Sequence, residues 1–298
     1  MTTEIRIDAL LPAEMAKRAE YVGVRKAETP FITMFALSIL AGAFIALGAI
    51  FATTILSGGM AIKDPQGATV LTTSVPYGLN RLFGGLVFCL GLILVVVGGA
   101  ELFTGNNLIV MAWASGKVSS QALLRNWGIV YVGNFVGALG TAGLIYISKQ
   151  WMFSSGAVGL NALNIAKSKV ELGFLQAIAL GILCNALVCL AVWMTYSARS
   201  TIDKIAAIIF PITAFVAAGF EHSIANMYFI PIGLFIKNYA GEPFWTMIDK
   251  TPADYASITW TAFFYNLVPV TIGNIIGGAL FVAAIYWMVF LRPAKISQ

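Results

Sequence analysis

Long apolar runs separated by short polar stretches dominate the chain. A membrane-spanning helix needs roughly 20 apolar residues, and six stretches reach that length, at about residues 31–56, 82–113, 123–147, 173–195, 205–236 and 257–291. The pattern therefore predicts an all-α integral membrane protein with six transmembrane helices. Because the last stretch is too long for one span, we expect Pro269 to divide it into an interfacial piece and a span at 267–291.

Polar residues interrupt the second and fifth runs, at 99–107 and 219–226. An ionisable side chain at the centre of a membrane helix costs about 2.5–3.5 kcal/mol on insertion scales. Glu101 and Glu221 therefore either accept hydrogen bonds from backbone N–H groups that a broken helix leaves unpaired, or they take part in function. Both possibilities stay open. In either case, the helix N-termini exposed at a break favour an anion in the adjoining cavity.

The two breaks belong to a repeated pattern. Residues 101–106 and 221–226 both read Glu, three residues, a small residue and Asn. Residues 133–137 and 273–277 both read Gly-Asn-x-x-Gly, a spacing that is also typical of close helix packing. Two matched pairs in the same order indicate two three-helix halves. Because three is odd, the second half must enter the membrane upside down, which predicts inverted repeats with broken helices two and five around a midplane binding site.

Composition agrees with a membrane domain that has no soluble module attached. Of the 298 residues, 59% are apolar and only 10% are charged. The net charge of +5 is spread over many loops, which favours solvated loops over a nucleic-acid partner. The three cysteines lie in apolar runs without metal-ligand or disulfide spacing. No phosphate-binding or catalytic motif is present, so we expect no metal, no cofactor and no enzymatic activity.

The distribution of lysine and arginine predicts the orientation. With six spans, both termini lie on the same side of the membrane. The two terminal segments and the loops after spans two and four carry eleven of these residues, and the other three loops carry seven. Since cytoplasmic loops are enriched in positive charge, we expect a cytoplasmic N-terminal helical segment at 1–30, a membrane domain at 31–291 and a cytoplasmic tail at 292–298. Whether residues 1–30 pack beneath the bundle or gate a pore stays open.

His222, the single histidine of the chain, lies in the second break beside Glu221. Its unperturbed pKa of about 6.5 makes it the one side chain ready to exchange a proton near neutral pH. One histidine without a cysteine cluster cannot complete a metal coordination shell. We therefore interpret His222 as a functional titratable group, and a satisfied core histidine is the alternative.

Bulky apolar side chains surround the two breaks. Leu102 and Phe103 lie in backbone predicted to be non-helical, which is tolerated at membrane depth only where it is buried or lines a cavity. An apolar constriction at such a place would exclude hydrated ions. The candidates are Phe88, Leu92, Leu102, Phe103 and Phe215.

The motifs around the breaks resemble the formate/nitrite transporter family over nearly the whole chain. The resemblance rests on Glu-Leu-Phe-Thr-Gly at 101–105, Gly-Phe-Glu-His-Ser-Ile-Ala-Asn-Met at 219–227, and Asn-Leu-Val-Pro-Val-Thr-Ile-Gly-Asn-Ile-Ile-Gly-Gly at 266–278. Residues 126–138 and 187–194 are most similar to the formate channel branch. The resemblance implies an aquaporin-like fold of inverted repeats, assembled as a homopentamer with one pore in each protomer.

The same resemblance implies roles for individual residues. His222, next to Glu221, would be the central pore histidine, and Thr104 would face it from the other break. Lys169 would draw anions towards the pore, with ordinary loop charge as the alternative. Two constrictions are implied: Leu92 with Phe215, and Leu102 with Phe103. The implied pore-side polar residues are Asn185, Asn226 and Asn274.

We therefore expect bidirectional passage of formate across a bacterial cytoplasmic membrane. Because a bare anion is heavily penalised in an apolar constriction, Lys169 would attract the anion, His222 would protonate it, and the neutral acid would pass. Nitrite and hydrosulfide are alternative permeants. A water or glycerol channel is disfavoured because neither break contains Asn-Pro-Ala, and an intramembrane enzyme because no acid–base pair or nucleophile accompanies His222.

Overall fold

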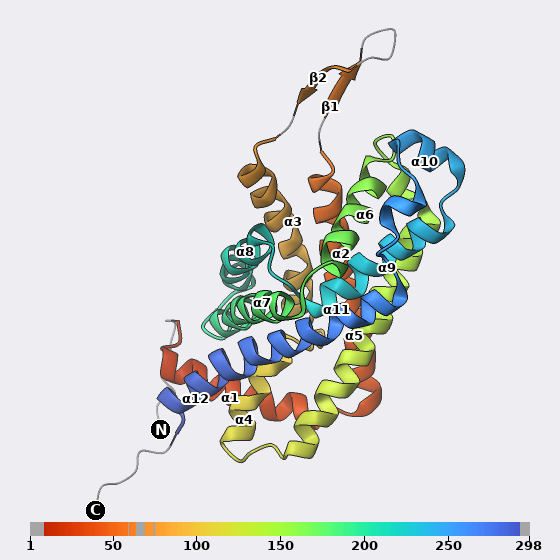
Figure 1. Cartoon of the computed structure of the whole chain (residues 1–298). Coiled ribbons are helices and arrows are strands. Elements are labelled where there is room, and N and C mark those ends of the chain that lie inside the picture. Colours follow the sequence, from red (N-terminus) through yellow and green to blue (C-terminus); the bar gives the residue numbers. More distant parts are fainter. Residues whose placement is uncertain (1–8, 59, 64–68, 74, 293–298) are drawn as a thin grey trace, which may run out of the picture.

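The computed structural model describes residues 9–58, 60–63, 69–73 and 75–292, and over these residues the chain folds as a helical bundle (Figure 1). Six helical stretches are long and apolar enough to cross a membrane, which confirms the predicted membrane fold. They are α2 (Phe31–Leu56), α3 (Tyr77–Gly98), α5 (Ser120–Ser148), α7 (Phe174–Thr195), α8 (Thr201–Ala218) and the last stretch, Pro252–Phe290.

Shorter elements complete the bundle and include the polypeptide that follows each predicted break. They are α1 (Pro12–Glu28), η1 (Gly105–Ile109), α4 (Val110–Ala114), η2 (Gln150–Met152), α6 (Ala157–Val170), α9 (Ser223–Tyr239), α10 (Glu242–Ile248) and η3 (Pro252–Tyr255). The helix of the second run stops at the end of α3 and resumes as η1, and that of the fifth run stops at the end of α8 and resumes as α9. This organisation is consistent with the predicted broken helices.

A short β-hairpin, which we did not predict, joins α2 to α3. Strands β1 (Met60–Lys63) and β2 (Thr69–Thr73) pair antiparallel, with Met60 opposite Thr73. The β2 residues include three threonines and a valine, which are β-branched and favour extended backbone, but the segment is too short for such a preference to be decisive in the sequence. The hairpin projects from the end of the bundle opposite α1 (Figure 1).

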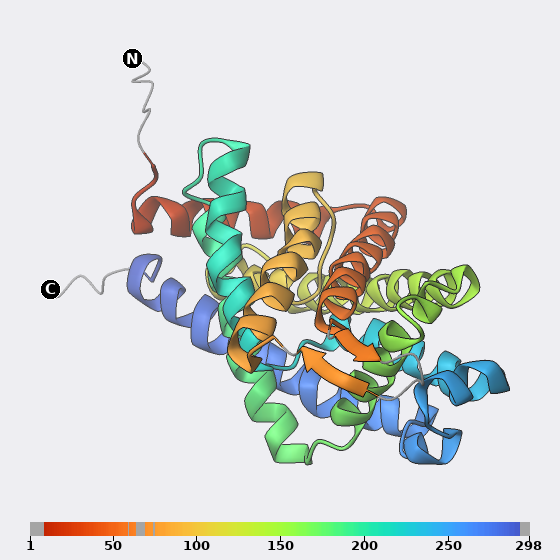
Figure 2. The same cartoon turned by 90° about the horizontal axis from the view of Figure 1, so that it is seen from above.

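The prediction that Pro269 divides the last stretch is wrong. α11 (Trp260–Ile275), η4 (Ile276–Ala284, wound as a π-helix) and α12 (Ile285–Phe290) follow one another without a break. They form one long rod beside α7 in both views (Figures 1 and 2). Pro269 is buried inside α11. A proline is tolerated in a membrane helix when neighbouring groups take over the hydrogen bonding that its missing N–H removes, so the helix continues through it.

α1 lies across one end of the bundle, the end at which α12 also finishes (Figure 1). Its buried residues include Met15, Ala19 and Gly23, and it packs against η1 and α4. Helices at both ends of the described chain therefore meet at one face, as an even number of spans requires. Residues 1–8 and 293–298 lie outside the described residues, so the proposed terminal boundaries and the cytoplasmic side remain predictions.

The two Gly-Asn-x-x-Gly segments lie where pairs of helices approach most closely. A Cβ atom on Gly137 would collide with the carbonyl oxygen of Ile39, and one on Gly277 would collide with that of Ile182. Each glycine therefore lets the backbone of one helix contact the backbone of another, α5 on α2 and η4 on α7. The motif is a packing element in both halves of the chain, as its spacing predicted.

Replacing Gly277 with alanine is expected to destabilise the protein by about 1–3 kcal/mol, because backbone atoms cannot yield to the added methyl group. Gly140 provides a matched control, since a Cβ atom there would meet no atom within 4 Å. Gly140→Ala should leave stability unchanged or raise it slightly, because alanine favours helix over glycine. Thermal unfolding of both variants in detergent tests the prediction, and equal melting temperatures would contradict it.

Candidate functional site

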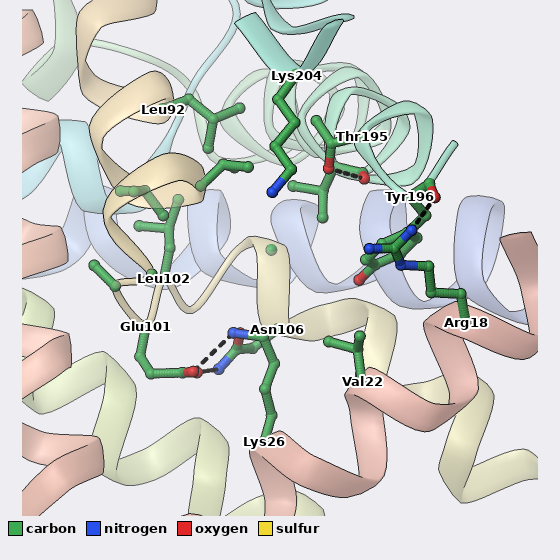
Figure 3. Close-up of a pocket in the computed structure, with 16 residues that line it drawn as sticks. Arg18, Val22, Lys26, Leu92, Glu101, Leu102, Asn106, Thr195, Tyr196 and Lys204 are labelled. Carbon is green, nitrogen blue, oxygen red and sulfur yellow. Dashed lines mark hydrogen bonds and ion pairs between the residues drawn. The ribbon is translucent and has the colours of Figure 1, made fainter. Parts of the chain in front are cut away.

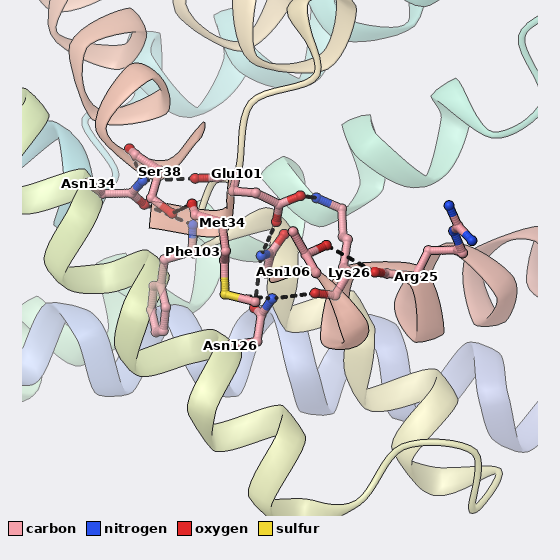
Figure 4. Close-up of polar contacts among 10 residues, drawn as sticks. Arg25, Lys26, Met34, Ser38, Glu101, Phe103, Asn106, Asn126 and Asn134 are labelled. Atoms are coloured by element: carbon pink, nitrogen blue, oxygen red, sulfur yellow. Dashed lines mark hydrogen bonds and ion pairs between the residues drawn. The ribbon is translucent and has the colours of Figure 1, made fainter. Parts of the chain in front are cut away.

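The first break is held open by one buried asparagine. α3 ends at Gly99, whose φ of 74° lies in the left-handed region that suits glycine. In the loop that follows, Asn134 donates through Nδ2 to the carbonyl of Glu101 at 2.9 Å and accepts through Oδ1 from the N–H of Phe103 at 2.9 Å. The N–H of Glu101 donates to the carbonyl of Leu37 at 3.2 Å. These bonds satisfy backbone groups that the interrupted helix leaves free (Figure 4).

The second break repeats the same contacts. α8 ends at Gly219, with φ of 76°. Asn274 donates to the carbonyl of Glu221 at 2.9 Å and accepts from the N–H of Ser223 at 2.9 Å. The N–H of Glu221 donates to the carbonyl of Leu180 at 3.3 Å. The two asparagines belong to the repeated Gly-Asn-x-x-Gly motifs, so the contacts are consistent with the predicted inverted repeat.

Within the described ranges, side chains and not backbone N–H groups bind the Glu101 carboxylate. Its Oε1 accepts from the Lys26 ammonium at 2.8 Å, and its Oε2 accepts from Asn106 Nδ2 at 2.7 Å (Figure 4). Asn106 also donates to Asn126 Oδ1 at 2.9 Å. The bracing role considered for this glutamate thus belongs to Asn134, and the carboxylate instead anchors a lysine.

The Glu221 carboxylate has the equivalent partners. Its Oε1 accepts from Lys169 at 2.8 Å, and its Oε2 accepts from Asn226 at 2.6 Å. Asn226 donates in turn to Asn266 Oδ1 at 2.8 Å. Lys169 lies in α6, and its ammonium is held at the second break by a buried carboxylate.

Lys26 is a site residue that the sequence analysis missed. Lys26 binds the glutamate of the first break, and Lys169 binds the glutamate of the second. The backbone carbonyls of the two lysines also accept hydrogen bonds from equivalent asparagines, that of Lys26 from Asn126 at 3.0 Å and that of Lys169 from Asn266 at 2.8 Å. A signal exists in the sequence: each lysine precedes a phenylalanine by five positions, at Lys26–Phe31 and at Lys169–Phe174, where the next apolar run begins. The repeat therefore extends into α1 and α6.

His222 joins the two breaks. Its Nε2 lies 2.9 Å from Thr104 Oγ1, and its Nδ1 accepts from the N–H of Ala225 at 3.1 Å as the N-cap of α9. Because Nδ1 is an acceptor in this bond, the ring is neutral and carries its proton on Nε2, which donates to the threonine hydroxyl oxygen. The ring also stacks on Phe215, with centroids 6.0 Å apart. The predicted facing of His222 and Thr104 is present in the structure.

Three cavities lie in series around these residues. The α1-side cavity has a volume of 330 Å³ and is lined by residues that include Lys26 and Glu101 (Figure 3). The hairpin-side cavity has a volume of 140 Å³ and is lined by residues that include Lys169 and His222. Between them lies a central cavity of only 10 Å³. Its lining is apolar apart from one residue and consists of Ile45, Phe88, Leu92, Leu102, Val188, Ile212, Phe215 and His222.

Residues that line two neighbouring cavities mark the two boundaries between the cavities. Leu92 and Leu102 border both the α1-side and the central cavity. Phe88 and Phe215 border both the central and the hairpin-side cavity, and their rings pack edge to face with centroids 5.6 Å apart. The predicted residues are therefore paired differently from the expectation, because Leu92 lies with Leu102 and Phe215 lies with Phe88.

Phe103 does not border any of these three cavities, contrary to the prediction. Its ring packs against Tyr131 at 5.0 Å and Trp127 at 6.0 Å, and it lines a lateral groove between α5 and α11. The bond from its N–H to Asn134 turns the side chain towards α5. Phe103 therefore faces the lateral groove and not the three cavities.

The three predicted pore-side asparagines are braces in the structure. Asn226 and Asn274 bind the second break as described above. Asn185 donates to the carbonyls of Thr104 at 3.2 Å and Asn274 at 2.7 Å, and so joins the first break to α11, whose Asn274 binds the second break. All three are buried, and none lines one of the three cavities among the described residues. The amides of Asn185 and Asn274 bind backbone, and that of Asn226 binds the side chains of Glu221 and Asn266.

Comparisons with known proteins agree on one family. Residues 13–288 match the family model described as formate/nitrite transporter. The formate channel FocA of Escherichia coli K12 is 46% identical over 98% of both chains, and that of Haemophilus influenzae is 42% identical over 91% of this chain and 92% of its own. A solved structure described as a pentameric formate channel with formate bound is 45% identical, with a TM-score of 0.80 over 88% of this chain and 98% of its own.

Proposed function

Because the chain belongs to the formate/nitrite transporter family, we propose that it passes formate across a membrane through the three cavities in series. The observation that carries this proposal is the central cavity of 10 Å³. It is apolar apart from His222 and lies between two larger cavities that each contain a lysine. Such a path admits a small permeant from either side and suits passage in both directions.

The lysines at the breaks attract the anion. Lys26 and Lys169 each border a cavity while a glutamate holds the ammonium in place. Either lysine is reached before a constriction, so formate loses part of its hydration next to a positive charge. A bare monoanion in the central cavity would still be penalised, because its apolar lining offers little to replace water. The species that crosses is therefore the neutral acid.

His222 exchanges the proton. In the geometry described, its ring holds one proton, on Nε2, and Nδ1 is occupied by the N–H of Ala225. Taking up a second proton on Nδ1 must release that N–H and open the N-cap of α9. The charged form of the ring donates a proton to formate, and it returns to the capped neutral state when the proton on Nδ1 is the one that leaves. Proton exchange is thus coupled to the first turn of α9.

The named relatives support proposals about the type of activity and the oligomeric state. They are named as channels and transporters, and we propose transport without chemical conversion of the permeant beyond this proton exchange. We place the protein in a bacterial cytoplasmic membrane with the α1 face towards the cytoplasm, as the charge distribution predicts. We also propose a homopentamer. The pentameric state of a solved relative supports it.

A proteoliposome flux assay with formate, nitrite and hydrosulfide tests the proposed permeant. We expect formate to pass fastest, because the relatives named above are formate channels, and to equilibrate from either side of the vesicle. Liposomes without protein measure the passive leak of each neutral acid. A formate flux no greater than this leak would contradict the proposal, and a faster flux of nitrite or hydrosulfide would replace the permeant within the same family.

A further inference from the structure

The α1-side cavity carries more positive charge than the function proposed above requires. Three cationic side chains, those of Arg18, Lys26 and Lys204, line it together with one carboxylate, that of Glu101 (Figure 3). Three positive charges and one negative charge leave a formal charge of +2 around this space. Two cations and one carboxylate line the hairpin-side cavity, which leaves +1. The two cavities therefore differ in the anion that each suits.

Two of the three cations in the α1-side cavity are available to a ligand. Lys26 is bound to Glu101 at 2.8 Å. Arg18 uses Nη1 to donate to the carbonyl of Tyr196 at 3.0 Å, but a guanidinium has five N–H donors. Lys204 projects into the cavity from α8 (Figure 3), and its ammonium has no hydrogen bond or ion pair within the described part of the chain.

The hairpin-side cavity has no equivalent available pair. Lys169 is bound to Glu221 at 2.8 Å. Arg81 donates to the backbone at the end of α8, from Nε to the carbonyl of Ala217 at 3.1 Å and from Nη2 to the carbonyl of Val216. Each cation of that cavity therefore has a partner, unlike Lys204, and the excess charge of +1 there is smaller than the +2 of the α1-side cavity.

Size separates what the α1-side cavity can hold from what can pass beyond it. Its volume is 330 Å³, whereas the next cavity has a volume of 10 Å³. Leu92 and Leu102 border both spaces, so a ligand of several carbon atoms could rest against them and not cross. A molecule held there would stand in the path of every smaller permeant that arrives from either side.

We propose that the α1-side cavity is a binding site for a short-chain dicarboxylate, and that the bound dianion blocks permeation. One carboxylate pairs with the planar guanidinium of Arg18, whose geometry suits two parallel hydrogen bonds, and the other pairs with Lys204. A dianion neutralises the charge of +2, which a monocarboxylate does not. The binding step is independent of the proposed permeant, and only the block rests on the proposed function.

Inhibition from one face tests the site. Succinate is added to either side of vesicles that contain the protein, and formate flux is measured in each case. We expect succinate to inhibit from the α1 face and not from the hairpin face, and butyrate, a four-carbon monoanion, to inhibit much less. The α1 face is identified by thiol labelling of the variant Lys17→Cys, since the three native cysteines are buried. Equal inhibition from both faces, or by butyrate, would overturn the proposal.

Two matched variants test the residues. Lys204→Gln is expected to raise the half-inhibitory concentration of succinate about tenfold, because it removes one charge-assisted hydrogen bond. Lys17→Gln makes the same change of charge on α1 but outside the cavity and should leave inhibition as it is. Each variant is scored as the ratio of its own flux with and without succinate, so a change in basal flux cancels. An unchanged half-inhibitory concentration in Lys204→Gln would refute the site.

Calorimetric titration of succinate into the detergent-solubilised protein separates this inference from the proposed function. Succinate binding in a protein that shows no formate flux would contradict the proposed function and support the site. Formate flux without succinate binding would support the proposed function and overturn the site. Lys204→Gln should also raise the calorimetric dissociation constant for succinate about tenfold.

Discussion

Replacing His222 with asparagine is expected to reduce proton-linked formate flux about 100-fold, the lower end of what a positioned proton-transfer group contributes, while the protein still folds. This substitution removes the titratable group while it keeps the helix cap. His222 caps α9 by accepting from the N–H of Ala225, and asparagine is among the best residues for that task. What it cannot do is take up and release a proton near neutral pH.

The measurement is the pH change inside proteoliposomes during formate uptake, normalised to the amount of folded oligomer. His222→Leu is the structural control, because leucine can neither cap nor titrate. Loss of the cap should lower its stability by about 1 kcal/mol, whereas His222→Asn should melt close to the wild type. Unchanged proton movement and flux in His222→Asn would show that the histidine only caps a helix, and the proton-exchange step would have to be abandoned.

Replacing Lys169 with methionine is expected to destabilise the protein by about 3–5 kcal/mol, because it leaves a buried carboxylate without its ion pair. The side chains of Lys169 and Glu221 are only 12% and 5% exposed, and they lie 2.8 Å apart. A low flux in this single variant would therefore not by itself reveal anion capture. The double variant Lys169→Met/Glu221→Gln removes both charges and should recover most of the lost stability.

Formate flux in the double variant should stay low at low formate and approach the wild type at saturating formate, since the cavity loses its attraction for the anion. The equivalent pair on the other side, Lys26 and Glu101, is the matched comparison. The Lys26 and Glu101 side chains are 27% and 8% exposed, so this pair loses less hydration on folding than the pair of Lys169 and Glu221, and the destabilisation in Lys26→Met should be smaller. Melting temperatures and flux at two formate concentrations test both statements. Wild-type flux at low formate in the double variant would refute anion capture by Lys169.

The number of spans and the positions of both breaks could be predicted from the sequence alone, although the start of the last span could not. Their signals are local: a bilayer requires a certain length of apolar residues, and a carboxylate inside such a length is costly wherever the helix packs. The repeated Gly-Asn-x-x-Gly segments were equally readable, because only glycine allows helix backbones to come as close as they do at Gly137 and Gly277. Their asparagines, Asn134 and Asn274, act at the breaks, which the spacing did not reveal.

The directions of side chains at the breaks were decided only by the tertiary structure. Phe103 and its neighbour Leu102 occupy consecutive positions in non-helical backbone, where no periodicity relates side-chain direction to sequence position. A bond from the Phe103 N–H to Asn134, a residue from a different helix, directs one ring to the lateral groove while the other side chain faces the central cavity. The pairing of Leu92 with Leu102 follows from the same long-range geometry.

For the charged residues of the site too, the sequence shows where they lie along the chain, and only the tertiary structure shows which of them pair. Both lysines could be read from the sequence as basic residues before an apolar run, but the ion pair of Lys26 with Glu101 joins residues 75 positions apart. No local pattern specifies such a pair, because it depends on how α1 packs against the first break. Composition and spacing thus determine which segments enter the membrane and where they are interrupted. Packing between distant helices determines which polar groups meet, since hydrogen bonds at membrane depth must be satisfied inside the protein by whatever segment the fold brings near.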